Sequence, residues 1–133
     1  MKSIYPYLYF NGNCRAAVEY YQSCLGAKVE WLGNCNGDTG NSVEARIIIE
    51  TTVILAADYS PNCLFSRGNA ATLFIKFHSS YMLFRQFERL VADGIVHLLP
   101  GPVAGGLMAE LSDPFGVRWI FFFPAPTNSS IFL

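Results

Sequence analysis

The sequence predicts an α+β fold built from two similar modules, each with the order strand, helix, three strands. The chain has 133 residues, which is the size of one domain, and 52% of them are hydrophobic against 14% charged. This composition excludes a disordered chain. Apolar residues recur at helical spacing in two segments, and the other segments have strand composition. The same order of elements occurs twice, about 65 residues apart, which indicates a duplicated unit within a single domain over residues 1–133.

The first module is expected at about residues 4–58. A strand rich in tyrosine and phenylalanine covers residues 4–11, and Asn13 after it is a good helix N-cap. Apolar residues at spacings of three and four predict an amphipathic helix from Cys14 to Leu25, which Gly26 ends. Strands are predicted at 28–32, 43–50 and 53–58, with a loop rich in glycine and asparagine at 33–41.

The second module is expected at about residues 72–123, after an irregular connection over 59–69. A strand at 72–77 precedes a helix that Ser79 or Ser80 caps and that runs to about Ala92. Met82, Phe84, Phe87 and Leu90 form its predicted core stripe. Strands follow at 95–99, 107–111 and 117–123, with turns at 100–102, 105–106 and 113–116, and then a loose tail at 124–133.

Charge and composition exclude several classes of function. Nine Lys and Arg against ten Asp and Glu give a net charge of −1, so nucleic-acid binding is not expected. The apolar runs are far shorter than the roughly 20 residues that cross a bilayer, and residues 1–6 do not resemble a signal peptide, so we expect a cytoplasmic protein. The cysteines at 14, 24, 35 and 63 have neither zinc-site nor redox spacing and are expected to be buried or inert thiols. The low charge fraction suggests an apolar face hidden in a homodimer.

Four motifs in order carry a resemblance to a known family. They are YPYLYFNGNC at 5–14, YYQSCLGA at 20–27, VILAAD at 53–58 and SDPFGVRW at 112–119. Together they resemble the PhnB-like branch of the vicinal oxygen chelate superfamily, which includes glyoxalase I, fosfomycin-resistance enzymes, extradiol dioxygenases and bleomycin-binding proteins. The resemblance spans residues 4–123 and implies two βαβββ modules whose mixed sheets curl around a cavity, usually completed by a second subunit.

The resemblance also indicates where a metal would be held. In metal-dependent members, His or Glu side chains from both modules hold one divalent ion, and the matching positions here are Pro6, Leu55, Thr72 and Ile120. Since these residues do not form the usual ligand set, the resemblance implies a small-molecule-binding protein with no cofactor. The Phe-Trp-Gly loop common in PhnB-like proteins is replaced by Val103-Ala104-Gly105.

Two alternatives stay open. The first is a divalent-metal-dependent lyase, isomerase or dioxygenase with ligands drawn from Glu44, Glu110, His78 and His97. The second is a structural or regulatory dimer without a ligand.

Side-chain alternation predicts the residues that line the cavity. In the last strand, Arg118, Ile120 and Phe122 share one face, and Val117, Trp119 and Phe121 point to the helix. The same parity places these residues on the cavity face: Leu8, Phe10, Glu44, Arg46, Ile48, Glu50, Thr72, Phe74, Lys76, Met108, Glu110 and Ser112. A solvated sheet face or a dimer seam would produce the same alternation.

The predicted ligand-binding residues come from this set: Arg118, Arg46, Lys76, Glu44, Glu110, Phe122 and Phe74. Arg46 and Arg118 are expected to hold a carboxylate or phosphate, because a guanidinium group presents fixed donors to a planar oxyanion. Lys76 would add a point charge. Glu44 and Glu110 would neutralise the arginines or accept hydrogen bonds from the ligand.

Overall fold

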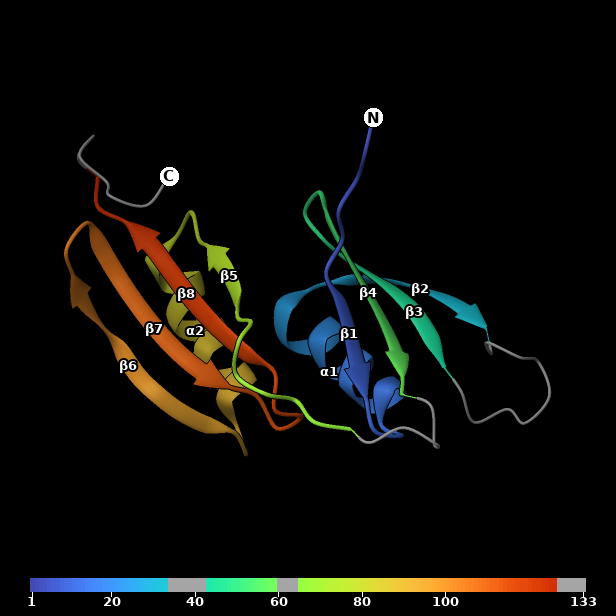
Figure 1. The fold of residues 1–133 in the computed structure, drawn as a ribbon. Coiled ribbons are helices and arrows are strands. Elements are labelled where there is room, and N and C mark those ends of the chain that lie inside the picture. The colour runs from blue at the N-terminus through green and yellow to red at the C-terminus, as the bar shows by residue number, and fades with distance from the viewer. Residues whose placement is uncertain (34–42, 60–64, 127–133) are drawn as a thin grey trace. The chain divides into compact units, whose positions relative to one another are not determined.

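A computed structural model describes residues 1–33, 43–59 and 65–126 of the chain (Figure 1). The chain divides into two compact units, Met1–Ser66 and Arg67–Leu133. Within the described residues, each unit contains one helix and one mixed four-stranded sheet in the order strand, helix, three strands. The predicted fold class of two βαβββ modules is therefore confirmed.

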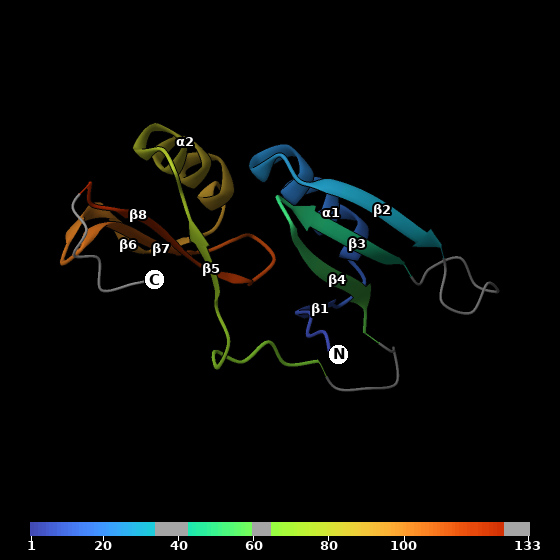
Figure 2. The same ribbon diagram turned by 90° about the horizontal axis from the view of Figure 1, so that it is seen from above.

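The first unit contains β1 (Tyr7–Phe10), α1 (Cys14–Leu25), β2 (Lys28–Gly33), β3 (Glu44–Ile49) and β4 (Thr52–Asp58). Its sheet has the order β1-β4-β3-β2, in which β1 and β4 are parallel and the other pairs are antiparallel. Helix α1 covers one face of this sheet (Figure 2). The helix buries Val18 and Tyr21, and the covered face of the sheet buries Ala45, Ile47 and Ile54. This packing explains the helical spacing seen in the sequence.

The second unit repeats the arrangement with β5 (Leu73–Lys76), α2 (Ser80–Val91), β6 (Ile95–Val103), β7 (Gly106–Ser112) and β8 (Arg118–Pro124). Its sheet has the order β5-β8-β7-β6, with β5 parallel to β8. Val117, Trp119 and Phe121 are buried as predicted, and the ring of Phe87 in α2 lies 6.4 Å from that of Phe121. We call the side of each sheet that its helix does not cover the open face.

The core stripe of α2 differs from the prediction. Met82 and Phe84 are 38% and 44% exposed, and the prediction that both belong to the core is wrong. The buried residues are Leu83, Phe87 and Leu90. Their spacings of four and three follow the 3.6-residue helical repeat, which turns positions 82 and 84 to either side of the buried line.

The turn predicted at 100–102 is also wrong, because β6 continues through Pro100-Gly101-Pro102 to Val103. Strand β6 lies at the edge of its sheet, where a missing proline N–H is tolerated, and its register with β7 shifts between Leu98 and Gly101. The chain reverses at Ala104-Gly105, one residue before the turn predicted at 105–106, and Gly105 has a φ of 91°, in the left-handed region that favours glycine.

Each helix begins with a different kind of cap. Asn13 occupies the N-cap position of α1, but its side chain makes no capping hydrogen bond. The Asp58 carboxylate at the end of β4 takes that role, since its Oδ1 accepts from the backbone N–H groups of Gly12 at 3.0 Å and Cys14 at 2.9 Å. In α2, the Ser79 hydroxyl accepts from the backbone N–H of Met82 at 3.3 Å, so Ser79 rather than Ser80 is the cap.

The side chains of Cys14 and Cys24 are buried, as expected. Cys35 and Cys63 lie outside the described residues, as do most of the predicted loop 33–41, part of the connection 59–69 and most of the tail. Within the described part of the chain, neither helix has the length and apolar character needed to cross a membrane.

Candidate functional site

Strand pairing fixes the residues on the open face of the first unit. Arg46 in β3 is paired with Leu55 in β4 and with Glu30 in β2, and Glu44 is paired with Ala57. Residues paired across a sheet share a face. These side chains therefore lie opposite the buried Ala45 and Ile47, and the alternation placed Glu44 and Arg46 on the correct face.

The same alternation fails in β1. Its parallel register pairs Tyr7 with Leu55 and Leu8 with Ala56, so Tyr7 and Tyr9 belong to the open face. Phe10 is fully buried, and its ring lies 6.4 Å from the Tyr21 ring of α1. The prediction that Leu8 and Phe10 line the cavity is wrong, because the parity of one strand does not transfer to another until the pairing register is known.

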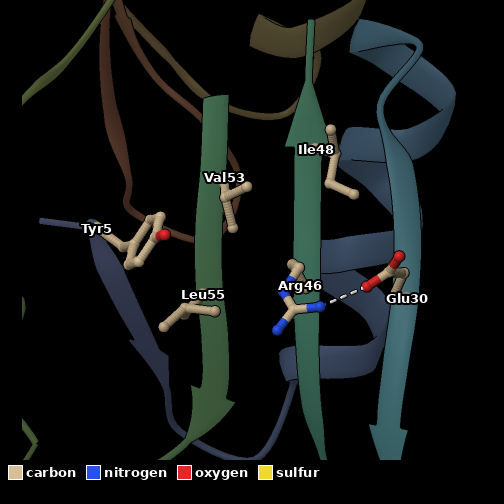
Figure 3. A pocket seen from close by; sticks show the side chains of 6 residues that line it. All are labelled: Tyr5, Glu30, Arg46, Ile48, Val53 and Leu55. Carbon is tan, nitrogen blue, oxygen red and sulfur yellow. Dashed lines mark hydrogen bonds and ion pairs between the residues drawn. The ribbon is translucent and has the colours of Figure 1, made fainter. Parts of the chain in front are cut away.

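A hollow of about 370 Å³ lies on the open face of the first unit, lined by Tyr5, Glu30, Arg46, Ile48, Val53 and Leu55 (Figure 3). Tyr5 lies beside Val53 and Leu55 of β4, and on the other side of these residues Arg46 of β3 points toward Glu30 of β2. The Arg46 guanidinium donates from Nη1 to Oε1 of Glu30 over 2.6 Å. The hollow thus joins an apolar side to a charged side, which is the usual composition of a small-molecule site.

A row of aromatic side chains lies on β1 and the segment after β4. The rings of Tyr7 and Tyr9 stack with centroids 4.7 Å apart, and Tyr59 meets Tyr9 edge-on at 5.1 Å and Phe65 at 5.6 Å. The Tyr7 hydroxyl donates to Oε2 of Glu44 over 2.7 Å. Glu44 is therefore engaged by a tyrosine, whereas Arg46 pairs with Glu30.

The other predicted site residues lie on the open face of the second unit. Arg118 and Glu110 form an ion pair with 3.5 Å between Nη2 and Oε1, and the rings of Phe74 and Phe122 lie 6.0 Å apart. Lys76 is paired with Phe122 across β5 and β8, and Phe122 is fully buried. His97 Nε2 lies 2.8 Å from the Ser112 hydroxyl. The seven predicted residues thus form two groups, one in each unit.

Sequence reasoning missed Tyr5, Tyr7 and Glu30. Tyr7 was assigned to the wrong face, and Tyr5 precedes the strand proper. Glu30 belongs to the strand predicted at 28–32, but its place beside Arg46 follows from the register of β2 with β3. That register depends on the long connection between β2 and β3, which composition does not fix.

The positions where the resemblance would put a metal do not fit one. The Pro6 carbonyl accepts a hydrogen bond from the Leu55 N–H at 2.9 Å, and the Leu55 side chain lines the hollow. Thr72 is exposed and Ile120 is half-buried. Among residues 1–33, 43–59 and 65–126, no three His, Cys, Asp or Glu side chains gather as a metal would require.

Solved structures show the fold family to which this geometry corresponds. The chain matches the protein PA1353 from Pseudomonas aeruginosa with a TM-score of 0.85 and 26% identity, over 93% of this chain and 98% of that one. It matches a glyoxylase/bleomycin resistance protein/dioxygenase domain from Frankia sp. EAN1pec with a TM-score of 0.72 and 17% identity, over 94% and 99% of the two chains. The fold of this chain is therefore the one that these two solved structures share.

The fold that the resemblance implied is thereby confirmed. A further match is a putative 3-demethylubiquinone-9 3-methyltransferase, PhnB protein, from Bacillus cereus, with a TM-score of 0.78 and 19% identity over 92% of this chain and 99% of that one. At this level of identity the likeness concerns the fold alone. The sequence matches no model of a protein family and no curated protein.

Proposed function

We propose that this chain is a cytoplasmic, homodimeric small-molecule-binding protein of the PhnB-like, glyoxalase and bleomycin-resistance kind, and that the hollow on the open face of the first unit is its binding site. The observation that carries the proposal is the hollow itself, in which Arg46 faces an apolar wall of Val53 and Leu55. Its volume of about 370 Å³ lies within the range of known ligand sites.

The residues at the metal positions favour binding without a metal. Pro6 and Leu55 occupy the two positions in the first unit, and Leu55 contributes apolar surface to the hollow instead of a ligand atom. The metal-dependent alternative would need Glu44, Glu110, His78 or His97. Glu44 already accepts the Tyr7 hydroxyl, and His97 lies within hydrogen-bond distance of Ser112.

The predicted residues of the second unit are proposed as ligand-binding residues on the open face of that unit. Arg118 would bind an oxyanion of the ligand and Lys76 would add a positive charge, while Glu110 neutralises Arg118 in the empty protein. Phe74, which is exposed, would offer apolar surface, and the fully buried Phe122 would support its ring from below.

The proposal is tested by thermal unfolding in the presence of a library of small organic molecules and, separately, of nickel, zinc and manganese ions. A ligand bound by the native state alone raises the unfolding temperature in a saturable way. We expect library members to stabilise the wild type and the Val53→Thr variant, which keeps the shape of the hollow, but not Val53→Arg, which fills it.

Two results would count against the proposal. If no library member stabilises the protein, or if Val53→Arg binds as well as the wild type, the hollow is not the site. A saturable shift with one of the metal ions would favour the metal-dependent alternative, and the Glu44→Gln and Glu110→Gln variants would show which carboxylate is involved.

A further inference from the structure

The ion pair at the edge of the hollow is easily exchanged. The side chains of Arg46 and Glu30 are 43% and 54% exposed, although their charged atoms approach to 2.6 Å. Water and salt screen such a pair, so it contributes little to stability. A second carboxylate that reached Arg46 together with an apolar body could therefore replace Glu30 at small cost.

The geometry around Arg46 shows where that carboxylate would come from. Glu30 engages Nη1, and the other terminal nitrogen of the guanidinium lies on the side away from Glu30, toward β4 (Figure 3). Leu55, Val53 and the Tyr5 ring lie on that side. A guanidinium group binds a planar carboxylate through two parallel hydrogen bonds. With its carboxylate on Arg46, the ligand would lay its apolar body over these side chains.

The other charges on the open face limit the charge of the ligand. Glu30 and Glu44 both share this face with Arg46, and Glu44 is held there by the Tyr7 hydroxyl. Lys28 also shares this face, because it is paired with Ile48, but it does not line the hollow. In the hollow a dianion such as a phosphate monoester would gain one guanidinium, and the two carboxylates would repel it more strongly than they repel a monoanion. A neutral headgroup would not displace Glu30 from Arg46, and a cationic headgroup would be repelled by the Arg46 guanidinium.

We propose that the hollow binds a monoanionic carboxylic acid with an apolar or aromatic body, and that the carboxylate of the ligand displaces Glu30 from Arg46. This inference rests on the proposed function, because it names the ligand class for the same site. Glu30 is then a built-in competitor that keeps Arg46 paired when no ligand is bound.

The inference is tested by calorimetry with four probes that share one body and differ in the headgroup. These are 3-phenylpropionate, 3-phenylpropionamide, 3-phenylpropylamine and 3-phenylpropyl phosphate. The carboxylate is expected to bind at least about tenfold more tightly than the amide, since of these two probes only the carboxylate makes a charge-assisted pair with Arg46. The amine and the phosphate are expected to bind more weakly than the carboxylate.

Two variants assign this preference to named residues. Arg46→Gln is expected to remove the preference for the carboxylate over the amide. Glu30→Gln is expected to tighten carboxylate binding about two- to fivefold, because the competitor has lost its charge. Glu19→Gln, an exposed position on α1, is the matched control and should leave all four dissociation constants unchanged. Circular dichroism checks that each variant is folded.

The ligand class is overturned if the amide, the amine or the phosphate binds as tightly as the carboxylate, if Glu30→Gln weakens carboxylate binding, or if none of the four probes binds. The proposed function is judged separately by the library and by Val53→Arg. An amide that binds as tightly as the carboxylate and is lost in Val53→Arg would leave the hollow as a binding site and remove only the carboxylate assignment.

Discussion

The Asp113 side chain holds together the turn between β7 and β8. It is only 3% exposed, and its Oδ1 accepts from the backbone N–H groups of Phe115 at 2.8 Å and Val117 at 3.1 Å. Its Oδ2 accepts from Nε1 of Trp119 at 2.9 Å. One carboxylate thus satisfies two turn amides and the indole of a core residue, which explains why the turn chemistry of residues 113–116 was readable in the sequence.

Replacing Asp113 should therefore strongly destabilise the second unit. We expect Asp113→Ala to lower the free energy of unfolding by about 3–5 kcal/mol, because it leaves three donors without their acceptor in a buried site. Urea unfolding followed by circular dichroism measures the change. Glu88→Ala, an exposed carboxylate on α2, is the control and should change stability by no more than about 0.5 kcal/mol. A loss below about 1 kcal/mol for Asp113→Ala would contradict this account.

Arg118 provides a second test at the scale of single residues. If its guanidinium binds an oxyanion of the ligand, Arg118→Met should weaken binding of a ligand found in the library by about 1.5–3 kcal/mol, with little change in stability, because its partner Glu110 is partly exposed. Calorimetry with the purified variant measures both Kd and stoichiometry. An unchanged Kd would remove Arg118 from the proposed ligand-binding residues.

The face on which a side chain lies was predicted correctly where alternation within its own strand determines that face. Glu44, Arg46, Glu110 and Arg118 lie on the predicted faces because neighbouring positions in a strand point to opposite sides. Tyr7 and Glu30 could not be assigned in this way. Their place depends on which residue of another strand they oppose, and local sequence does not determine that register.

Among the elements, helix α1 begins with a long-range contact. The Asp58 carboxylate reaches from the end of β4 to the amides at the start of the helix, while Asn13 at the N-cap position makes no such bond. The charge of Asp58 also lies at the positive end of the helix dipole. The bounds of α1 were predicted correctly, but the cap was assigned to Asn13, which directly precedes the helix. Asp58 lies more than 40 residues away in the sequence and gives no local signal of its capping role.

Two substitutions compare the caps directly. Asp58→Ala is expected to lower the free energy of unfolding by about 1–2 kcal/mol, and Asn13→Ala by only a few tenths, since only the first removes a capping acceptor. Hydrogen exchange of the amides in the first turn of α1 should accelerate in Asp58→Ala alone. A larger loss in Asn13→Ala than in Asp58→Ala would show that Asn13 is the functional cap.

The end of strand β6 also depends on a feature that local sequence does not reveal. Pro100, Gly101 and Pro102 predicted a turn, but an edge strand accepts them with a shift of register. Whether a strand lies at an edge depends on the order of strands in the sheet. The sequence therefore predicted the start of β6 at Ile95 and missed its end at Val103.

For the whole molecule, the distribution of apolar surface favours a second subunit. Only 14% of the residues are charged, and Ile95 and Leu99 in β6 are 61% and 69% exposed. Exposed apolar surface of this kind is often covered in an oligomer. We expect sedimentation velocity at micromolar concentration to give a species of twice the chain mass of 14.8 kDa. A single species at 14.8 kDa would remove the homodimer from the proposed function.

The parallel pairing within each unit also has a consequence for protein synthesis. Strand β1 has its partner in β4, the last strand of the same unit, and β5 has its partner in β8. As the chain leaves the ribosome, β1 must wait, with Tyr7 and Tyr9 uncovered, until β4 has emerged. All four strands of the first sheet precede β5 in the sequence, however. The hydrogen bonds of the first sheet can therefore form while the ribosome is still translating the second unit.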